Sequence, residues 1–220
     1  MQDYATGDKM SLLPEGERKE LEMFLERKLE KKVKIIFFKG NTPECQYCSR
    51  IEELLKEISS LNEMIEYEVF DFKSPKAKMY KVKSAPVLLF EQKPNVRYLG
   101  IPSGHEFSAF MEDIVRISRN EIDLKLSTVQ KIMKIRKPVH IMVFVTPTCP
   151  YCPLAVKTAH MFAMANENIL AEMIEAIEYK RLAEKWNVMA VPKIVINEKI
   201  EFEGAYPEEI FADYVLKAVE

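Results

Sequence analysis

The four cysteines of this 220-residue chain fall into two pairs with identical spacing. Cys45 and Cys48 form one Cys-x-x-Cys pair, and Cys149 and Cys152 form the other. Cysteines three residues apart either form a reversible disulfide or bind a metal ion as thiolates. In disulfide exchange the nucleophile is the thiolate, so the surrounding structure must lower the pKa of the attacking thiol. The elements that hold the two pairs therefore decide their chemistry.

Each pair follows a short loop after an apolar, β-prone segment, at residues 33–38 and 139–145. An amphipathic pattern follows each pair, and we predict a helix that starts at its first cysteine. The first turn of a helix presents free N–H groups and the positive end of the helix dipole, which stabilise a thiolate. We therefore predict Cys45 and Cys149 as attacking thiols, and Cys48 and Cys152 as resolving thiols.

The second residue of the two motifs differs. Pro150 follows Cys149, and we predict that it occupies the first helical position, where its missing N–H has no cost. Gln46 takes the same place after Cys45 and leaves a less rigid turn. We therefore expect two unequal centres, with the C-terminal one stronger.

The chain repeats itself at an offset of 104 residues. Segment 42–45 (TPEC) aligns with segment 146–149 (TPTC), and Tyr47 aligns with Tyr151. Matches in the same order along the chain indicate a duplication. We expect both tyrosines to shape access to the thiols and to contact substrate.

The boundary between the copies is placed in the polar stretch 118–125, which gives predicted domains at residues 1–120 and 121–220. After an extra first helix, each copy has the β-α-β-α-β-β-α order of the thioredoxin fold. We predict an α/β protein of two tandem thioredoxin-fold units, each a mixed four-stranded sheet flanked by helices. In the first unit, the final hairpin is predicted to turn at Pro94-Asn95.

A proline opens a strand about 40 residues after each cysteine pair. These are Pro86 and Pro192, which align with a two-residue length change. We predict a cis bond before each, because cis proline marks specified tight turns. The backbone of Ala85 or Val191 would then face the reactive sulfur and pair with an extended substrate segment.

Composition excludes several other classes. The formal net charge of −2 provides no basic field for nucleic acid, and no apolar stretch approaches the ~20 residues of a membrane span. The first ten residues, MQDYATGDKM, lack the features of a secretory signal, so we expect a cytoplasmic protein. Lysine and glutamate dominate the charges, as in thermophile proteins.

The alternative interpretation of the four cysteines is that they bind a structural zinc ion. Zinc sites separate their two pairs by roughly 15–20 residues, whereas here about 100 residues lie between the pairs. Redox chemistry is therefore favoured, without a metal or other bound cofactor. A zinc-bridged, non-catalytic module stays open as the less favoured function.

Longer motifs resemble the protein disulfide oxidoreductases of hyperthermophilic archaea and bacteria, also called glutaredoxin-like proteins. The resemblance covers nearly the whole chain and rests on CQYC (45–48), TPTCPYCPLAV (146–156), VMAVPKIVIN (188–197), YLGIPSGHEF (98–107) and FEGAYPE (202–208). It implies an enzyme that reduces, forms and isomerises disulfides of protein substrates, with an NADPH-dependent thioredoxin reductase as electron donor. A reducing electron carrier for a peroxiredoxin-type enzyme is the alternative, because the same residues would serve it.

One acidic group of thioredoxin has no counterpart here. Thioredoxin carries a buried aspartate on the strand before its active site, and the comparable positions hold Lys39 and Val143. Asp71 and Glu175 match each other in the repeat and could substitute as proton acceptors. We interpret them instead as surface charges at strand ends.

Overall fold

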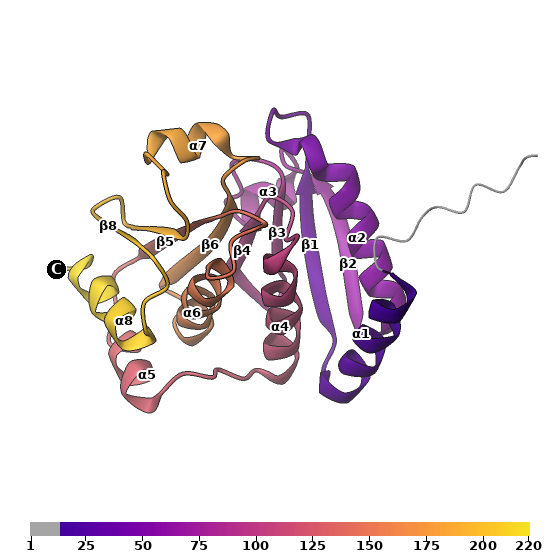
Figure 1. Cartoon of the computed structure of the whole chain (residues 1–220), viewed down its shortest axis with the longest axis horizontal. Coiled ribbons are helices and arrows are strands. Elements are labelled where there is room, and N and C mark those ends of the chain that lie inside the picture. Colours follow the sequence, from indigo (N-terminus) through magenta and orange to yellow (C-terminus); the bar gives the residue numbers. More distant parts are fainter. Residues whose placement is uncertain (1–13) are drawn as a thin grey trace, which may run out of the picture.

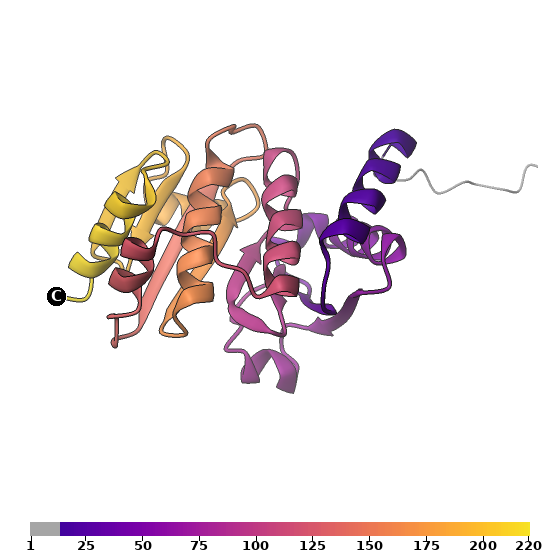
Figure 2. The same ribbon diagram turned by 90° about the horizontal axis from the view of Figure 1, so that it is seen from below.

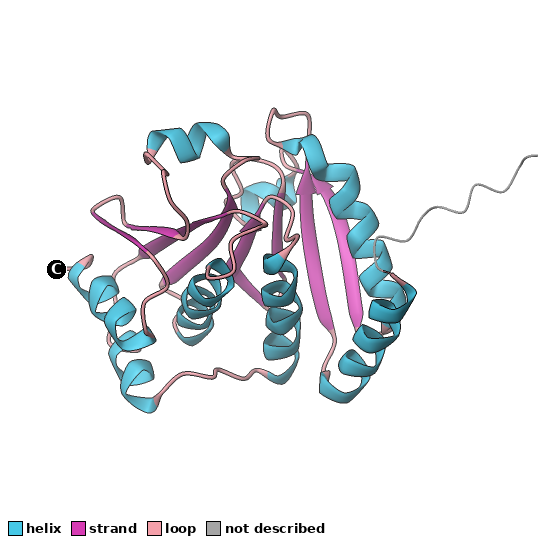
Figure 3. Ribbon diagram, in the orientation of Figure 1, coloured by secondary structure: helices cyan, strands magenta, loops and turns pink. Residues whose placement is uncertain are grey.

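The computed structural model describes residues 14–220, and its strands form one eight-stranded sheet (Figures 1 and 3). Residues 1–13, which include the stretch behind the expectation of a cytoplasmic protein, lie outside the described range. In spatial order the strands are β2 (Ile65–Asp71), β1 (Val33–Lys39), β3 (Val87–Phe90), β4 (Lys93–Leu99), β6 (Ile169–Glu175), β5 (Val139–Val145), β7 (Lys193–Ile196) and β8 (Ile200–Glu203).

Each half of the chain supplies four neighbouring strands. In both halves the first two strands pair in parallel and the remaining pairings are antiparallel. The prediction of two mixed four-stranded units is therefore confirmed. No sequence pattern predicts that β4 and β6 pair in parallel, from Val96 opposite Ala171 to Leu99 opposite Ile174, and so join the two units into one sheet.

Helices cover the two faces of the sheet unequally. One face packs against the long helices and α5, and the other packs against two short helices. The first group is α1 (Glu15–Lys28), α2 (Cys48–Leu61), α4 (His105–Arg119), α5 (Leu126–Ile132), α6 (Cys152–Ala165) and α8 (Glu208–Lys217). The second group is α3 (Pro75–Met79) and α7 (Lys180–Lys185).

Alternation along the strands creates the two cores. Ile35 and Phe37 of β1 face the long helices, whereas Ile36 and Phe38 face the short ones, and all four are buried. At the centre, α4 and α6 stand side by side over the strands where the units join (Figure 2). The core therefore runs across the boundary between the units without interruption.

The predicted turn at Pro94-Asn95 is wrong. The hairpin turns at residues 91–92, and Pro94 and Asn95 lie inside β4. The register shifts between Leu89 and Phe90, which is the kind of irregular pairing where a strand tolerates proline. The Asn95 amide is held by carbonyl oxygens of the C-terminal unit, so tertiary contacts override its turn preference.

None of the helices within residues 14–220 combines the length and the apolar character needed to cross a membrane.

Candidate active site

The N-terminal cysteine pair lies beyond the end of β1, at the start of α2. Cys45 and Cys48 are joined by a disulfide; Cys48 is buried and Cys45 is half-buried. A pocket of about 360 Å³ opens beside them and is lined by Lys39, Gly40, Asn41, Cys45, Cys48 and Asp71. The first centre is therefore accessible from one side.

The C-terminal pair occupies the equivalent place after β5. Cys149 and Cys152 are also joined by a disulfide, and both are buried. The Cys149 sulfur accepts a hydrogen bond from the backbone N–H of Cys152 at 3.1 Å, and it lies 3.6 Å from the Val191 carbonyl oxygen. A helix-terminal N–H directed at the sulfur is the interaction that stabilises a thiolate once the disulfide is reduced.

The predicted starts of the two helices are wrong. Both α2 and α6 begin at the second cysteine of the motif, and the first cysteine precedes the helix. Pro150 therefore lies outside α6, and Pro153 occupies its first turn instead. In the first centre a short 3₁₀ turn, Cys45–Tyr47, fills the gap.

The two centres also differ in the hydrogen bond made by the second cysteine. The Cys48 N–H bonds to the backbone carbonyl of Cys45. The Cys152 N–H bonds to the sulfur of Cys149 instead. Only the second arrangement, within the described residues, directs a backbone donor at the sulfur of the first cysteine.

Both prolines sit where the sequence analysis placed them, and the Ala85–Pro86 and Val191–Pro192 bonds are cis. Ala85 is fully buried, and its carbonyl accepts a hydrogen bond from the Thr42 hydroxyl at 2.8 Å. Val191 is half-buried. The structure thus brings each proline segment to its own cysteine loop, with the segment more open in the C-terminal unit.

The aromatic residues of the motifs point outward. Tyr47 is 46% exposed and Tyr151 is 66% exposed. Neither hydroxyl is hydrogen-bonded to another group of residues 14–220, and both rings stand on the surface around the thiols. Their exposure makes them available to a docked substrate.

The two strand-end acids do not behave alike. Asp71 is exposed, as interpreted, and lines the pocket of the first centre. Glu175 is buried, so its interpretation as a surface charge is wrong. Its carboxylate accepts N–H bonds from Ile177 and Glu178, and burial raises its pKa despite these bonds. The repeat masked this difference because Glu175 lies where the units meet.

Two contacts that no sequence prediction covers reach a centre from the other unit. The Tyr179 hydroxyl, buried at the start of α7, donates to the Pro86 carbonyl at 2.9 Å. The His105 backbone N–H donates to the Pro147 carbonyl at 3.0 Å. Gly104 in the motif YLGIPSGHEF was a signal for the contact made by His105, because glycine permits a close approach of two backbones. No sequence pattern pointed to Tyr179.

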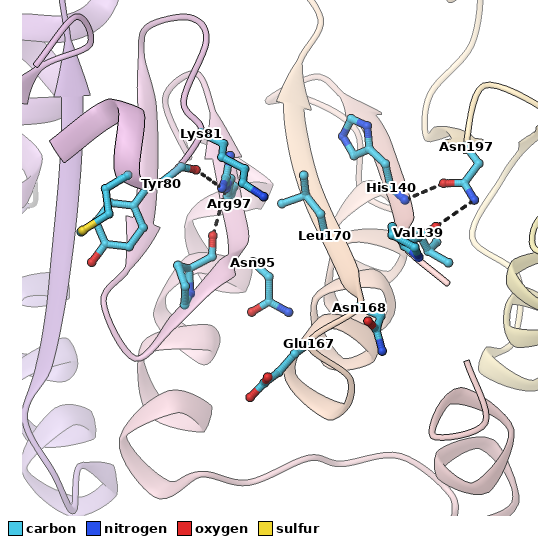
Figure 4. A pocket seen from close by; sticks show the side chains of 13 residues that line it. Tyr80, Lys81, Asn95, Arg97, Val139, His140, Glu167, Asn168, Leu170 and Asn197 are labelled. Carbon is cyan, nitrogen blue, oxygen red and sulfur yellow. Dashed lines mark hydrogen bonds between the residues drawn. The ribbon is translucent and has the colours of Figure 1, made fainter. Parts of the chain in front are cut away.

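A larger groove, of about 540 Å³, lies at the opposite end of β5, roughly 20 Å from the thiols at the ordinary strand rise (Figure 4). Arg97 there donates to the backbone carbonyls of Pro94 and Tyr80, and His140 contacts Glu172 at 2.7 Å. These polar groups are engaged with the protein itself. Within residues 14–220, no group of three His, Cys, Asp or Glu side chains gathers as a metal site.

Comparison with known proteins agrees with this geometry. Residues 139–217 match the thioredoxin domain family. The crystal structure of a protein disulfide oxidoreductase from Aeropyrum pernix K1 superposes with a TM-score of 0.84 at 34% sequence identity, over 92% of this chain and 91% of that one.

Two relatives are longer proteins. An NADH dehydrogenase of Bacillus subtilis (strain 168) is 29% identical over 160 residues, which cover 72% of this chain and 30% of that protein. The AhpF component of the alkyl hydroperoxide reductase of Staphylococcus aureus (strain NCTC 8325 / PS 47) is 31% identical over 106 residues, or 48% of this chain and 20% of that protein. The aligned regions thus span less than a third of either relative.

Each of the two disulfide-forming centres lies at the start of a helix and opposite a cis proline, an arrangement suited to thiol–disulfide exchange. The match to the Aeropyrum pernix protein extends over both units. The chain is a thiol–disulfide oxidoreductase that acts through two Cys-x-x-Cys centres, and it belongs to the protein disulfide oxidoreductase family.

Proposed function

We propose that Cys149 and Cys45 are the attacking thiols and that Cys152 and Cys48 resolve the intermediate. The Cys149 thiolate attacks one sulfur of a protein disulfide, and the other substrate sulfur leaves as a thiolate and takes up a proton. Cys152 then loses its proton and attacks Cys149, which closes the enzyme disulfide and releases the second substrate thiol. The substrate gains two electrons and two protons, and the reverse sequence forms a disulfide.

One observation carries these roles. The Cys149 sulfur receives the Cys152 N–H at 3.1 Å, so the helix start favours negative charge on the first cysteine of the motif. Cys152 is fully buried behind it, where a substrate disulfide cannot reach it first. We propose the same roles at Cys45 and Cys48 by the repeat.

The substrate lies as an extended segment against the proline loop. The backbone of Val191 pairs with this segment, while Pro192 holds the loop in place. In the first unit Ala85 and Pro86 take the same roles once the Thr42 hydroxyl releases the buried Ala85 carbonyl. This proposal is supported by the 3.6 Å approach of the Val191 carbonyl to the Cys149 sulfur. The exposed rings of Tyr151 and Tyr47 border the same surface.

The centres differ in strength. We expect the C-terminal one to be more active, because only its attacking sulfur accepts a backbone N–H bond within the described residues. Insulin reduction should fall further in Cys152→Ser than in Cys48→Ser. Equal losses in the two variants would contradict the assignment.

Alkylation tests the attacking thiols directly. In the reduced protein, Cys149 and Cys45 should react with iodoacetamide at about pH 6–7 faster than a free cysteine with its pKa of about 8.5. Cys149→Ser should abolish the fast phase assigned to the second centre, while Cys152→Ser keeps it. Alkylation no faster than that of free cysteine would refute the thiolate argument.

A second function is favoured by the relatives. Because this chain is similar to the AhpF component of alkyl hydroperoxide reductase, we propose as an alternative that it passes electrons to a peroxiredoxin-type enzyme. A thioredoxin reductase that uses NADPH would supply the electrons. A reduction potential of about −270 mV, with NADPH oxidation that depends on peroxide and peroxiredoxin, would favour this role over disulfide formation.

The last proposals concern the cellular location of the protein and the boundary between its two domains. We propose a cytoplasmic protein of a thermophile, with domains at residues 1–120 and 121–220. The link between α4 and α5 supports this boundary, since residues 121–125 carry no helix or strand. Limited proteolysis should cut there first, and cleavage elsewhere in the described chain would contradict the boundary.

A further inference from the structure

Contacts across the junction of the two units reach both thiol centres: the second unit contacts the first centre, and the first unit contacts the second centre. The junction is the β4–β6 pairing, and the loops that follow these two strands lie at the same end of the sheet as the cysteines. The loop after β4 contains Gly104, and the loop after β6 leads to Tyr179. Each loop belongs to one unit and contacts the active-site segments of the other.

Tyr179 of the second unit holds the proline loop of the first centre. Its buried hydroxyl donates to the Pro86 carbonyl at 2.9 Å and lies 3.4 Å from the Ser84 hydroxyl. The neighbouring Ala85 carbonyl is bound by Thr42 of the cysteine loop at 2.8 Å. The proline segment of the first centre is thus fixed between its own cysteine loop and a side chain from the other unit.

The turn at Gly104 of the first unit holds the cysteine loop of the second centre. Gly104 has a φ of 60°, and a Cβ atom there would lie 2.2 Å from the Pro147 carbonyl oxygen. His105, the next residue, donates its N–H to that oxygen at 3.0 Å. Pro147 precedes Cys149 by two residues. Because the contact joins two backbones, neither side can rotate away, and only glycine fits.

The repeat shows that these contacts are not copied between the units. Pro43, the counterpart of Pro147, has its carbonyl bound by the side-chain amide of Gln46, within its own loop. The residue that corresponds to Gln46 is Pro150, whose side chain carries no hydrogen-bond donor. The second centre therefore obtains from His105 of the other unit the hydrogen bond that the first centre supplies to itself.

We propose that Tyr179 and the Gly104–His105 turn are positioning residues, each held by one unit and acting on the thiol centre of the other. Each centre would then depend for its reactivity on the unit that does not contain its cysteines. This inference rests on the two-centre oxidoreductase function but assigns no new step to it. Ordinary interface packing would stabilise the fold without tuning a particular centre, and this difference makes the inference testable.

The test uses the full chain with one centre silenced at a time. Tyr179→Phe and Gly104→Ala are each placed in a Cys149→Ser/Cys152→Ser background and in a Cys45→Ser/Cys48→Ser background. The readouts are the equilibrium with glutathione and the pH profile of alkylation of the remaining attacking thiol. Tyr214→Phe and Gly16→Ala are matched controls: the Tyr214 ring stacks on Phe202 far along the sheet from the junction, and a Cβ at Gly16 would meet nothing within 4 Å apart from its chain neighbours and the backbone of its own helix.

We expect Tyr179→Phe to shift the glutathione equilibrium of the Cys45–Cys48 pair about three- to ten-fold, the effect of one lost hydrogen bond, and to leave the other pair within about two-fold. Gly104→Ala should do the reverse. Equal shifts of both centres by either variant, or no shift of the assigned centre in a folded variant, would overturn the proposal. Insulin reduction by the unaltered chain tests the underlying function separately.

Gly104→Ala could prevent folding, so a measurement on the unaltered chain accompanies it. The His105 amide should exchange with solvent at a rate that changes several-fold when the Cys149–Cys152 pair is reduced. Reduction of Cys45–Cys48 alone, in the variant that lacks the second centre, should leave the rate unchanged. An exchange rate independent of the redox state of Cys149–Cys152 would also overturn the proposal.

Discussion

Glu106 makes the stability of this protein depend on pH in a direction opposite to that of a usual carboxylate. It lies in the first turn of α4, is 1% exposed, and neither of its carboxyl oxygens has a hydrogen-bond partner in the described structure. Burial, and then the charge of Asp113, raises its pKa to about 8. Asp113 itself is bound by Tyr98, Arg116 and His160, so its hydrogen-bonding capacity is engaged elsewhere.

The sign of the effect follows from proton linkage. An unfolded glutamate titrates near about 4.3, so between roughly pH 4.5 and 8 the folded chain holds one proton more at Glu106 than the unfolded chain does. The free energy of unfolding therefore falls as pH rises, by up to about 1.4 kcal/mol per pH unit. Across about pH 5–8 this contribution approaches about 4 kcal/mol.

Glu106→Gln should remove this slope, because the amide cannot ionise and has a similar size. Guanidinium unfolding of the oxidised protein at several pH values between about 5 and 8, at constant ionic strength, measures it. Relative to Glu106→Gln, the unaltered chain should lose unfolding free energy steadily as the pH rises. Glu203→Gln, the same change at an exposed site on β8, should leave the slope as it was. Parallel curves for the unaltered chain and Glu106→Gln would refute the reasoning.

Three further predictions concern contacts between segments distant in the sequence, the first within the N-terminal unit and the other two across the junction, and guanidinium midpoints check each. Ser118→Ala should lower the unfolding free energy by roughly 2–3 kcal/mol, since its hydroxyl accepts the N–H groups of residues 30 and 31 and donates to a carbonyl there; a loss below about 0.5 kcal/mol would contradict this. Asn95→Ala should cost about 1–3 kcal/mol, because its amide donates to two carbonyls of the other unit, and Asn95→Asp should not restore the loss. Gly100→Ala should destabilise by about 1–3 kcal/mol, because φ is +104° and the new Cβ would lie 2.6 Å from that of Glu175; an unchanged midpoint would be the contrary result.

Local pattern was sufficient for most of the elements and for the chemistry. The apolar run at residues 33–38 and the β-rich run at 139–145 became β1 and β5, because buried central strands are apolar on both faces. The spacing of the cysteines and the matching prolines identified both centres. The two cysteines of each centre are close in sequence, and each pair recurs in the repeat together with its proline.

Features that depend on which segments meet in space were beyond the sequence. The pairing of β4 with β6 leaves no local signature, and Glu175 is buried because of it while its repeat partner Asp71 stays exposed. The helix starts were misplaced by one turn. At the second centre the Cys149 sulfur takes the role usually filled by a capping side chain, and at the first centre a 3₁₀ turn precedes the helix; no propensity records either feature. Tyr179 contacts the other unit through its own hydroxyl group, and no sequence pattern predicts such a contact.

The head-to-tail join also explains why the cysteine pairs of two repeated units have different surroundings. The first unit contributes β4 to the junction and the second contributes β6, whereas their counterparts, β8 and β2, form the outer edges of the sheet. A join between unlike edges places the loop after β4 against one centre and the loop after β6 against the other, so the neighbours of the two cysteine pairs must differ. The difference between the surroundings of the two centres is therefore a consequence of topology, and the exchange of Gln46 for Pro150 adds to it.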